Sequence, residues 1–383
     1  MREGWTYKNM SEVFDLQMGK TPDRKTPSYF GGNNVWVSIR DLDGKEIGES
    51  NEHITDTAVT TTNIRKVKKG TVIMSFKLTV GKCAICTKDL YTNEAIMAFN
   101  LKEGYDITPD FLYYYLSNYN WKGANKAVMG MTLNKATISQ QRISYPSLSE
   151  QQSIVAELDK INDLISLKKA QLSDLDSLAQ SIFYDMFGDP IENEKGWEVK
   201  KLGEIAVDKL SYGSGASAIN YNGETRYVRI TDINDNGELD DNKVSPSTID
   251  EKYLLKDGDI LFARSGATVG KTFLYTSKYG RCIYAGYLIR YIPDRNIVIP
   301  NYVLGLTKTH YYKSFIESTQ RAVAQPNINA KQYGELRIPL PPLPLQQEFA
   351  KRIELIEQQK AQISSTIKDL ETLLASRMQY WFD

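Results

Sequence analysis

Arginine, lysine, asparagine, glutamine and serine residues recur in this 383-residue sequence at positions between apolar runs, where loops are expected. Arginine and lysine can contact phosphates or donate two hydrogen bonds to guanine, and asparagine and glutamine can pair with adenine in the major groove. Each residue alone could lie on a solvated surface, but together they predict a DNA-binding surface. The candidates are Lys20, Arg40, Ser75, Lys77, Lys82 and Lys135, followed by Arg229, Arg264, Ser265, Lys271, Arg321, Gln325, Asn327 and Asn329.

The patterns that could support catalysis are weak. Cys83-Ala-Ile-Cys86 is a single CxxC pair without a nearby histidine, and a strand explains it better than a metal or redox site. Gly213-Ser-Gly215 resembles a dinucleotide-binding loop, but no apolar helix follows it. The two histidines have no catalytic partners close in sequence. We therefore expect no catalytic residues, no metal ion and no cofactor in this chain.

Two long stretches must position these loops. From Ser149 to Phe187, apolar residues are spaced alternately four and three apart, the heptad pattern of a helix that packs along a partner helix. Ser149 and Gln152 suggest a capping box at its start, and Gly188 marks its end. The pattern recurs about 195 residues later, with one lysine in each stripe. The seam residues are Ile154, Leu158, Ile161, Ile165, Lys168, Leu172, Leu175, Ala179, Ile182 and Met186, then Phe349, Ile353, Ile356, Lys360, Ile363, Ile367, Leu370, Leu374 and Trp381.

The segments before the two helices are divergent copies of each other. Gly196-Trp197 corresponds to Gly4-Trp5, and Tyr227-Val-Arg-Ile-Thr-Asp232 corresponds to Trp36-Val-Ser-Ile-Arg-Asp41. The second helix stops where the first continues into Gly196-Trp197, so the repeat is cyclic. If a two-fold axis relates the copies, the C-terminus lies near Gly4-Trp5 and the helices run antiparallel.

These observations predict an α+β fold with a pseudo-two-fold internal repeat. We expect two similar α/β-mixed domains, at residues 1–148 and 188–343, separated by two long antiparallel coiled-coil helices, at residues 149–187 and 344–383. Strands are expected at 35–42, 71–76, 81–87 and 94–101, and a helix at 109–117, from β-branched and aromatic content between turn residues.

Composition places the chain among ordinary globular proteins of two or more domains, with 41% hydrophobic and 25% charged residues. The formal net charge is zero, which by itself argues against a nucleic-acid partner, but charge is segregated. Residues 1–148 carry 19 Lys and Arg against 15 Asp and Glu, and residues 149–187 carry 3 against 7. Three cysteines, no long apolar run and no leader pattern favour a cytoplasmic protein without membrane contact.

The chain resembles the DNA-specificity subunit of type I restriction-modification systems. The resemblance rests on Gly19-Lys-Thr-Pro22, Trp36-Val-Ser-Ile-Arg-Asp41, the block from Gly70 to Lys82, and Ile338-Pro-Leu-Pro-Pro-Leu343 with Gln346-Gln347 opening a long helix. It implies two target-recognition domains that each bind one half of a split double-stranded DNA site. It also implies that the helices set the spacer and dock two modification subunits, and that these partners bind S-adenosylmethionine and methylate adenine. Restriction subunits with motor activity would complete the complex.

Two other classes of protein remain open from the residues alone. A self-contained DNA-acting enzyme would need a metal or cofactor motif. A coiled-coil scaffold without a DNA role would show no salt-dependent binding to duplex DNA. One departure from the family pattern is Ser144-Tyr-Pro146-Ser, which lacks the proline-rich sequence of the second copy.

Overall fold

A computed structural model describes residues 2–121, 125–127, 130–321 and 327–383. The chain forms two compact units. Unit 1 comprises Met1–Leu167 and Thr366–Asp383, and unit 2 comprises Lys168–Ser365. These units differ from the four segments expected from the sequence, because each unit contains one half of each long helix. Apolar residues of both helix halves are part of each unit's core.

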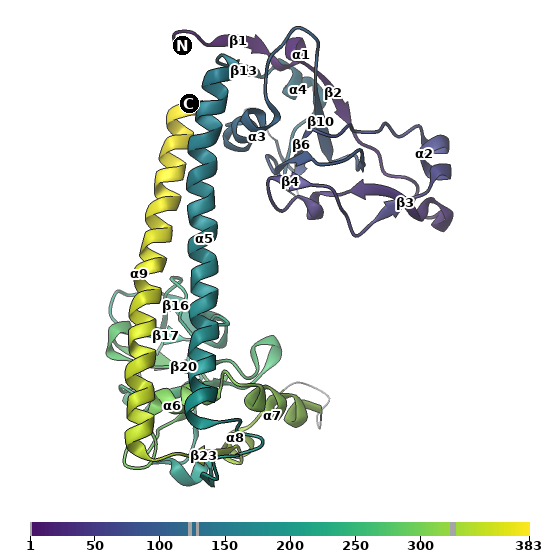
Figure 1. The fold of residues 1–383 in the computed structure, drawn as a ribbon. Helices are drawn as coiled ribbons and strands as arrows, with labels where there is room; N and C mark the ends of the chain where they lie inside the picture. The colour runs from purple at the N-terminus through teal and green to yellow at the C-terminus, as the bar shows by residue number, and fades with distance from the viewer. Residues whose placement is uncertain (1, 122–124, 128–129, 322–326) are drawn as a thin grey trace. The chain divides into compact units, whose positions relative to one another are not determined.

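The two long helices are α5 (Leu148–Phe187) and α9 (Leu343–Phe382), each of 40 residues. Figure 1 shows α5 in teal and α9 in yellow as adjacent helices. They are antiparallel within each unit. In unit 1, Glu157 of α5 accepts a hydrogen bond from the indole N–H of Trp381 near the end of α9 (3.0 Å). In unit 2, Phe183 packs edge-on against Phe349 near the start of α9, with ring centroids 5.6 Å apart.

The heptad prediction is confirmed, because the predicted apolar seam residues of both helices are buried or half-buried. The predicted capping box is wrong. The helix begins one residue earlier, at Leu148, and the hydroxyl of Ser147 accepts the N–H of Glu150 (3.4 Å). Ser149 therefore lies inside the first turn. The predicted end is correct: Gly188 has φ +77° and donates its N–H to the carbonyl of Tyr184 (2.8 Å).

The largest sheet of unit 1 has five strands in the order β2-β10-β6-β8-β4. All neighbouring pairs are antiparallel except β4–β8. Their bounds are β2 Phe14–Met18, β4 Glu46–Ile47, β6 Val72–Ser75, β8 Cys83–Cys86 and β10 Ile96–Leu101. Helix α3 (Pro109–Asn118) and the N-terminal half of α5 share a hydrophobic core with this sheet.

The expected strands at 71–76, 81–87 and 94–101 and the helix at 109–117 correspond to β6, β8, β10 and α3. The strand expected at 35–42 is instead β3 (Phe30–Val37), followed by a 3₁₀ turn at Ile39–Asp41. The Asp41 carboxylate accepts the N–H (2.7 Å) and hydroxyl (2.9 Å) of Ser38, which ends the strand. A second sheet of unit 1 pairs β3 with β5 (His53–Ile54) and β9 (Tyr91–Thr92).

Unit 2 repeats this plan with a four-stranded antiparallel sheet in the order β15-β22-β19-β20. The bounds are β15 Ser211–Tyr212, β19 Ile260–Ala263, β20 Thr272–Leu274 and β22 Leu288–Tyr291. Helices α6 (Pro300–Leu306) and α7 (His310–Arg321) follow the sheet, and α8 (Ala330–Gly334) precedes the last strand, β23 (Arg337–Leu340). β23 pairs with β14 (Glu198–Lys201), as β13 (Arg142–Tyr145) pairs with β1 (Thr6–Asn9) in unit 1.

Two buried glutamines show the repeat at atomic detail. The side chain of Gln151 accepts the N–H of Thr108 (2.9 Å) and donates to the carbonyls of Asp106 (2.8 Å) and Pro146 (3.0 Å). In unit 2, Gln346 makes the equivalent three bonds. It accepts from Ile299 (2.8 Å) and donates to Ile297 (3.3 Å) and Pro341 (2.7 Å). Each glutamine joins its long helix to two loops, which confirms the predicted α+β repeat and its equivalent helix starts.

Candidate nucleic-acid interface

Each unit brings two sequence-distant loops together at an equivalent place. In unit 1, β7 (Lys77–Leu78) pairs with β12 (Gly130–Thr132), and the N–H of Leu133 donates to the carbonyl of Phe76 (2.8 Å). In unit 2, Ser265 forms a bridge with Asn327, and the N–H of Ile328 donates to the carbonyl of Arg264 (2.9 Å). We call these places the loop pair of unit 1 and the loop pair of unit 2.

The loop pair of unit 2 contains three predicted residues, Arg264, Ser265 and Asn327. The Nε–H of Arg264 donates to the Oδ1 of Asn327 (3.2 Å). The guanidinium carbon lies 4.8 Å from the ring centroid of Tyr212. The Tyr212 hydroxyl in turn accepts the N–H of Ala330 (3.1 Å). The sequence prediction thus named residues that the fold assembles, but it missed Tyr212.

Tyr212 is 42% exposed and immediately precedes Gly213. A Cβ atom at Gly213 would lie 2.3 Å from the carbonyl oxygen of Ala285 and 2.4 Å from that of Tyr284. Gly19 in unit 1 is equally close to backbone carbonyls, so the two glycines occupy equivalent positions. An exposed aromatic residue beside a repeated glycine was the signal that could have identified Tyr212.

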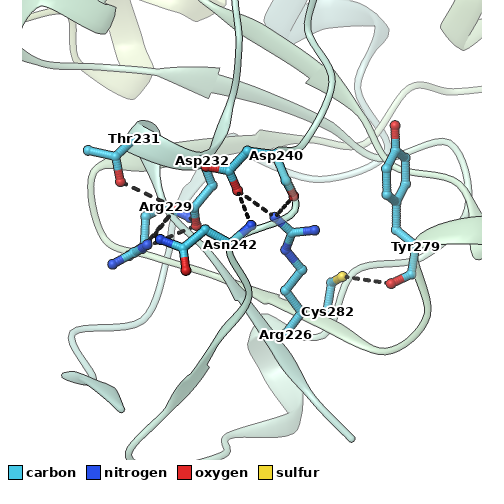
Figure 2. A network of polar contacts seen from close by, with 8 residues as sticks. All are labelled: Arg226, Arg229, Thr231, Asp232, Asp240, Asn242, Tyr279 and Cys282. Carbon is cyan, nitrogen blue, oxygen red and sulfur yellow. Dashed lines mark hydrogen bonds and ion pairs between the residues drawn. The ribbon is translucent and has the colours of Figure 1, made fainter. Parts of the chain in front are cut away.

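Two predicted cations of unit 2 form ion pairs within the unit. Figure 2 shows the Arg229 guanidinium against the carboxylate of Asp232, with Nη2 and Oδ1 2.7 Å apart. Hydrogen bonding to this carboxylate raises the pKa of Arg229 above its ordinary value. Lys271 pairs with Asp235 (2.8 Å) and donates to the carbonyl of Ile233 (3.2 Å). Both side chains would have to give up these bonds to contact DNA directly.

The same network holds Arg226, whose side chain is 5% exposed. Its Nη2 donates to the backbone carbonyl (2.7 Å) and the carboxylate (3.1 Å) of Asp240, as Figure 2 shows. Burial raises the pKa of Cys282 to about 11 and that of Tyr279 to about 12. Neither group is therefore ionised near neutral pH, and the network is suited to holding loop 226–242 rather than to chemistry.

The other predicted residues of unit 2 are placed less fully. Asn329 is exposed, but its side chain caps α8 by accepting the N–H of Gln332 (2.9 Å). Arg321 is the last residue of α7. Gln325 lies outside the described residues.

In unit 1, Arg40, Lys82 and Lys135 are exposed. Lys20 is also exposed and donates to the carbonyl of Thr62 (2.5 Å). Lys77 is half-buried, with its ammonium 5.4 Å from the ring centroid of Phe76. Arg40 and Lys20 lie outside the unit 1 loop pair, to which Lys77 belongs.

The prediction for Ser75 is wrong. Its side chain is fully buried, and its hydroxyl donates to the carbonyl of Thr79 and accepts the N–H of Lys82 (3.1 Å). These bonds close the turn between β6 and β8. Ser75 therefore shapes the loop and has no surface with which to contact a ligand.

In unit 1, Arg24 also lies against aromatic rings, and it was not among the predicted residues. The guanidinium carbon of Arg24 lies 4.8 Å from the ring centroid of Phe30 and 5.0 Å from that of Trp36. Its two Nη atoms donate to the two carboxylate oxygens of Glu52 (2.7 and 2.8 Å). Because the fork is fully used by this carboxylate, the charge of Arg24 is balanced within unit 1.

Cysteine chemistry finds no support in the structure. Cys83 and Cys86 lie in β8, and burial raises the pKa of each thiol to about 12. Among the described residues, no three His, Cys, Asp or Glu side chains gather in a way that could hold a metal ion. No helix in the described part of the chain is long and apolar enough to cross a membrane.

A family model for the type I restriction modification DNA specificity domain matches residues 2–176 and 194–372. The chain belongs to this family. The family prediction made from the sequence is thus confirmed, and each matched segment contains one loop pair.

The chain is also similar to individual specificity subunits. It is 31% identical over 234 residues to the type I restriction enzyme MjaIX specificity subunit of Methanocaldococcus jannaschii, covering 55% of this chain and 53% of that protein. It is 24% identical over 230 residues to the StySPI specificity subunit of Salmonella potsdam, covering 55% and 50%. The chain thus spans about half the length of the curated relatives it matches.

Two solved structures show the same fold. The S subunit of a type I restriction-modification system from M. genitalium matches with a TM-score of 0.55 and 15% identity, over 99% of this chain and 96% of the other. A chain from a study of complex assembly and conformational transition of the type I R-M system matches with a TM-score of 0.64 and 17% identity, over 100% and 98%. At these identities the likeness is one of fold.

Proposed function

We propose that this chain is the DNA-specificity subunit of a type I restriction-modification enzyme, and that each unit recognises one half of a two-part site in double-stranded DNA. The observation that carries the proposal is the pair of equivalent loop pairs in a member of this family. Their backbone hydrogen bonds match, whereas their side chains differ: Lys77 stands in one, and Arg264, Ser265 and Asn327 stand in the other.

A constant frame with different side chains is suited to binding two different DNA sequences. Base edges distinguish sequences through the donors and acceptors of the contacting side chains. Exposed cations such as Arg40, Lys82 and Lys135 would contact phosphates and fix the position of the protein on the duplex. This division of labour needs only local basic surfaces, which is compatible with a net charge of zero.

In this proposal the chain is not an enzyme and works in the cytoplasm. Two modification subunits would bind S-adenosylmethionine and methylate adenine, and restriction subunits would cleave the DNA. Surface leucines on the long helices support a docking role, because a large part of each side chain stays exposed. The leucines are Leu164, Leu167 and Leu178 on α5, and Leu355 and Leu373 on α9, exposed by 39 to 66%.

The decisive experiment exchanges one unit's recognition segment and maps methylation in cells that carry the complete system. Replacing residues 1–148 with the equivalent segment of a relative of different specificity should change one half of the methylated motif only. The matched control replaces residues 188–343 and should change only the other half. A change in both halves, or in neither, would contradict independent recognition by the two units.

The same preparation separates the alternative classes. Methyl transfer or cleavage by the purified chain, free of modification and restriction subunits, would make it an enzyme. Lack of salt-dependent binding to duplex DNA by the chain with its modification subunits would make it a scaffold. We expect neither result.

We further propose that the long helices set the spacer between the half-sites. Inserting four residues after Leu167 in α5 and four after Ser365 in α9, at the boundary between the two units in each helix, adds about 6 Å of helix at ~1.5 Å per residue. Base pairs are ~3.4 Å apart along the duplex, so the spacer should lengthen by at most about two base pairs. The half-sites themselves should be unchanged. Efficient methylation at the original spacing by the lengthened protein, still bound to its modification subunits, would refute this role.

A further inference from the structure

The backbone of Arg264 is held from two sides. Its N–H donates to the carbonyl of Tyr287 (3.1 Å), and its carbonyl accepts the N–H of Ile328 (2.9 Å). The preceding residue, Ala263, accepts a bond from the buried hydroxyl of Tyr333 (2.8 Å). Segments from two separate parts of unit 2, at Tyr287 and at Ile328–Tyr333, therefore fix the position from which the Arg264 side chain starts.

The side chain is then oriented by two further contacts. Asn327 accepts the Nε–H, and the ring of Tyr212 lies beside the guanidinium group. Tyr212 is itself anchored through its hydroxyl to the N–H of Ala330. The Nε bond and the ring contact leave the two Nη groups, which form the fork of the guanidinium, unused by these neighbours.

Arg264 differs in charge balance from three other arginines of unit 2. Arg226, Arg229 and Arg281 each form an ion pair with a carboxylate of the unit. In the part of the chain that the structure describes, Arg264 has no such ion pair, and its recorded partners are the neutral Asn327 and Tyr212. An oriented guanidinium with an uncompensated charge and a free fork is an arrangement prepared for an external acceptor.

We propose that Arg264 recognises a guanine in the half-site bound by unit 2, with Tyr212 and Asn327 as positioning residues; this rests on the function proposed above. The two Nη groups would donate to O6 and N7 of guanine, which present two acceptors side by side in the major groove. A phosphate contact requires charge but little orientation, whereas a base contact requires the fixed fork that Tyr212 and Asn327 provide.

The test uses the complete complex in cells, with methylated motifs mapped across a library in which every half-site position is randomised. The Arg264→Ala variant should lower the preference for guanine at one position of the half-site of unit 2 by roughly ten- to a hundredfold. All other positions, including the whole half-site of unit 1, should keep their preference. Arg264→Lys should fail to restore the preference, because an ammonium group cannot donate as a planar fork.

Arg337→Ala is the matched control, since Arg337 is an exposed arginine of the same unit at the start of β23. It removes the same charge and should leave the motif unchanged. Tyr212→Leu keeps Arg264 but removes the ring, and should relax the same single position as Arg264→Ala. This second variant keeps the proposal testable if Arg264→Ala fails to assemble.

Three results would overturn the inference. One is a uniform loss of methylation in Arg264→Ala with no position relaxed, accompanied by a salt dependence of DNA binding that is lower by about one phosphate contact. Another is full restoration of the preference by Arg264→Lys. The third is relaxation of different positions by Tyr212→Leu and Arg264→Ala. A wild-type complex that methylates no two-part motif would instead refute the proposed function, and this inference with it.

Discussion

Replacing Gln151 by leucine should destabilise unit 1, and replacing Gln346 by leucine should destabilise unit 2. Both side chains are fully buried, and each makes three hydrogen bonds to backbone groups of its own unit. Leucine has a similar length but no polar atoms. Each substitution therefore leaves one backbone N–H and two backbone carbonyls without their glutamine partner. The bonds to Pro146 and Pro341 are fully buried, and the other bonds are partly buried.

The size of the effect follows from these three groups. A buried polar group without a partner costs about 1–3 kcal/mol, and burial of the leucine side chain offsets about 1.5–3 kcal/mol of the total. Because two of the three groups are only partly buried and can regain water, we expect a net loss of about 1–4 kcal/mol in the free energy of unfolding of the affected unit. This is a large share of the stability of a typical domain.

Hydrogen exchange measured by mass spectrometry can assign the loss to a unit, which a single melting curve of a two-unit chain cannot. Gln151→Leu should accelerate exchange in peptides around Thr108, and Gln346→Leu in peptides around Ile299. The neighbouring Gln152 is exposed and provides the matched control, because Gln152→Leu should change stability by no more than about 0.5 kcal/mol. Equal destabilisation by Gln151→Leu and Gln152→Leu, or faster exchange around Ile299 alone in Gln151→Leu, would refute this reasoning.

Gly213→Ala should destabilise unit 2 by more than ~2 kcal/mol in chemical denaturation, because its Cβ would overlap two backbone carbonyls. Gly215→Ala, with no atom within 4 Å of the added Cβ, should have little effect, and equal losses would contradict the prediction. The pKa of Glu157 is lowered, chiefly by its hydrogen bond from Arg377. The stabilisation of the folded state by this bond is therefore present above the unfolded-state pKa and is lost as pH falls through the folded-state pKa. The difference in urea midpoint between wild type and Arg377→Met should therefore shrink from pH 7 to pH 3, and a constant difference would refute the assignment. Lys360→Met should leave unit 2 as stable or raise its stability by up to ~2 kcal/mol in urea, because the two half-exposed carboxylates bonded to this buried lysine regain water. A loss above ~2 kcal/mol would show instead that the ion pairs stabilise the seam.

The long helices and the repeat could be predicted because their signals are local and periodic. Heptad spacing identifies which face is buried without knowledge of the partner, and the seam residues behave accordingly. The glutamine pairs were visible in the sequence as repeated letters. The sequence does not show that Gln151 is buried and Gln152 is exposed, because this difference depends on loops that contact Gln151.

The candidate site was predictable only in part, because the sequence does not show which charges are already paired. Arg229 and Asp232 occupy the positions of Ser38 and Asp41 in the repeat, and both aspartates accept the N–H of the residue three positions earlier. The aspartate thus makes the same backbone hydrogen bond in both units, and in unit 2 Arg229 also forms an ion pair with Asp232. The three-residue spacing could have suggested this local pairing. Ser75 was misjudged for a related reason, since a hydroxyl can close its own turn.

The loop pairs also show how one frame can present unlike side chains. Phe76 and Arg264 are equivalent by their backbone bonds, since each carbonyl accepts the N–H of a buried residue, Leu133 or Ile328. The Phe76 ring is buried in the core of unit 1, whereas Arg264 extends to Tyr212 and Asn327. Because backbone hydrogen bonds hold the two loops together, the side chain at this position does not have to pack into the core. A buried aromatic and an oriented cation can therefore replace each other without a change of fold, which is what the proposed recognition of two different half-sites by one chain would require.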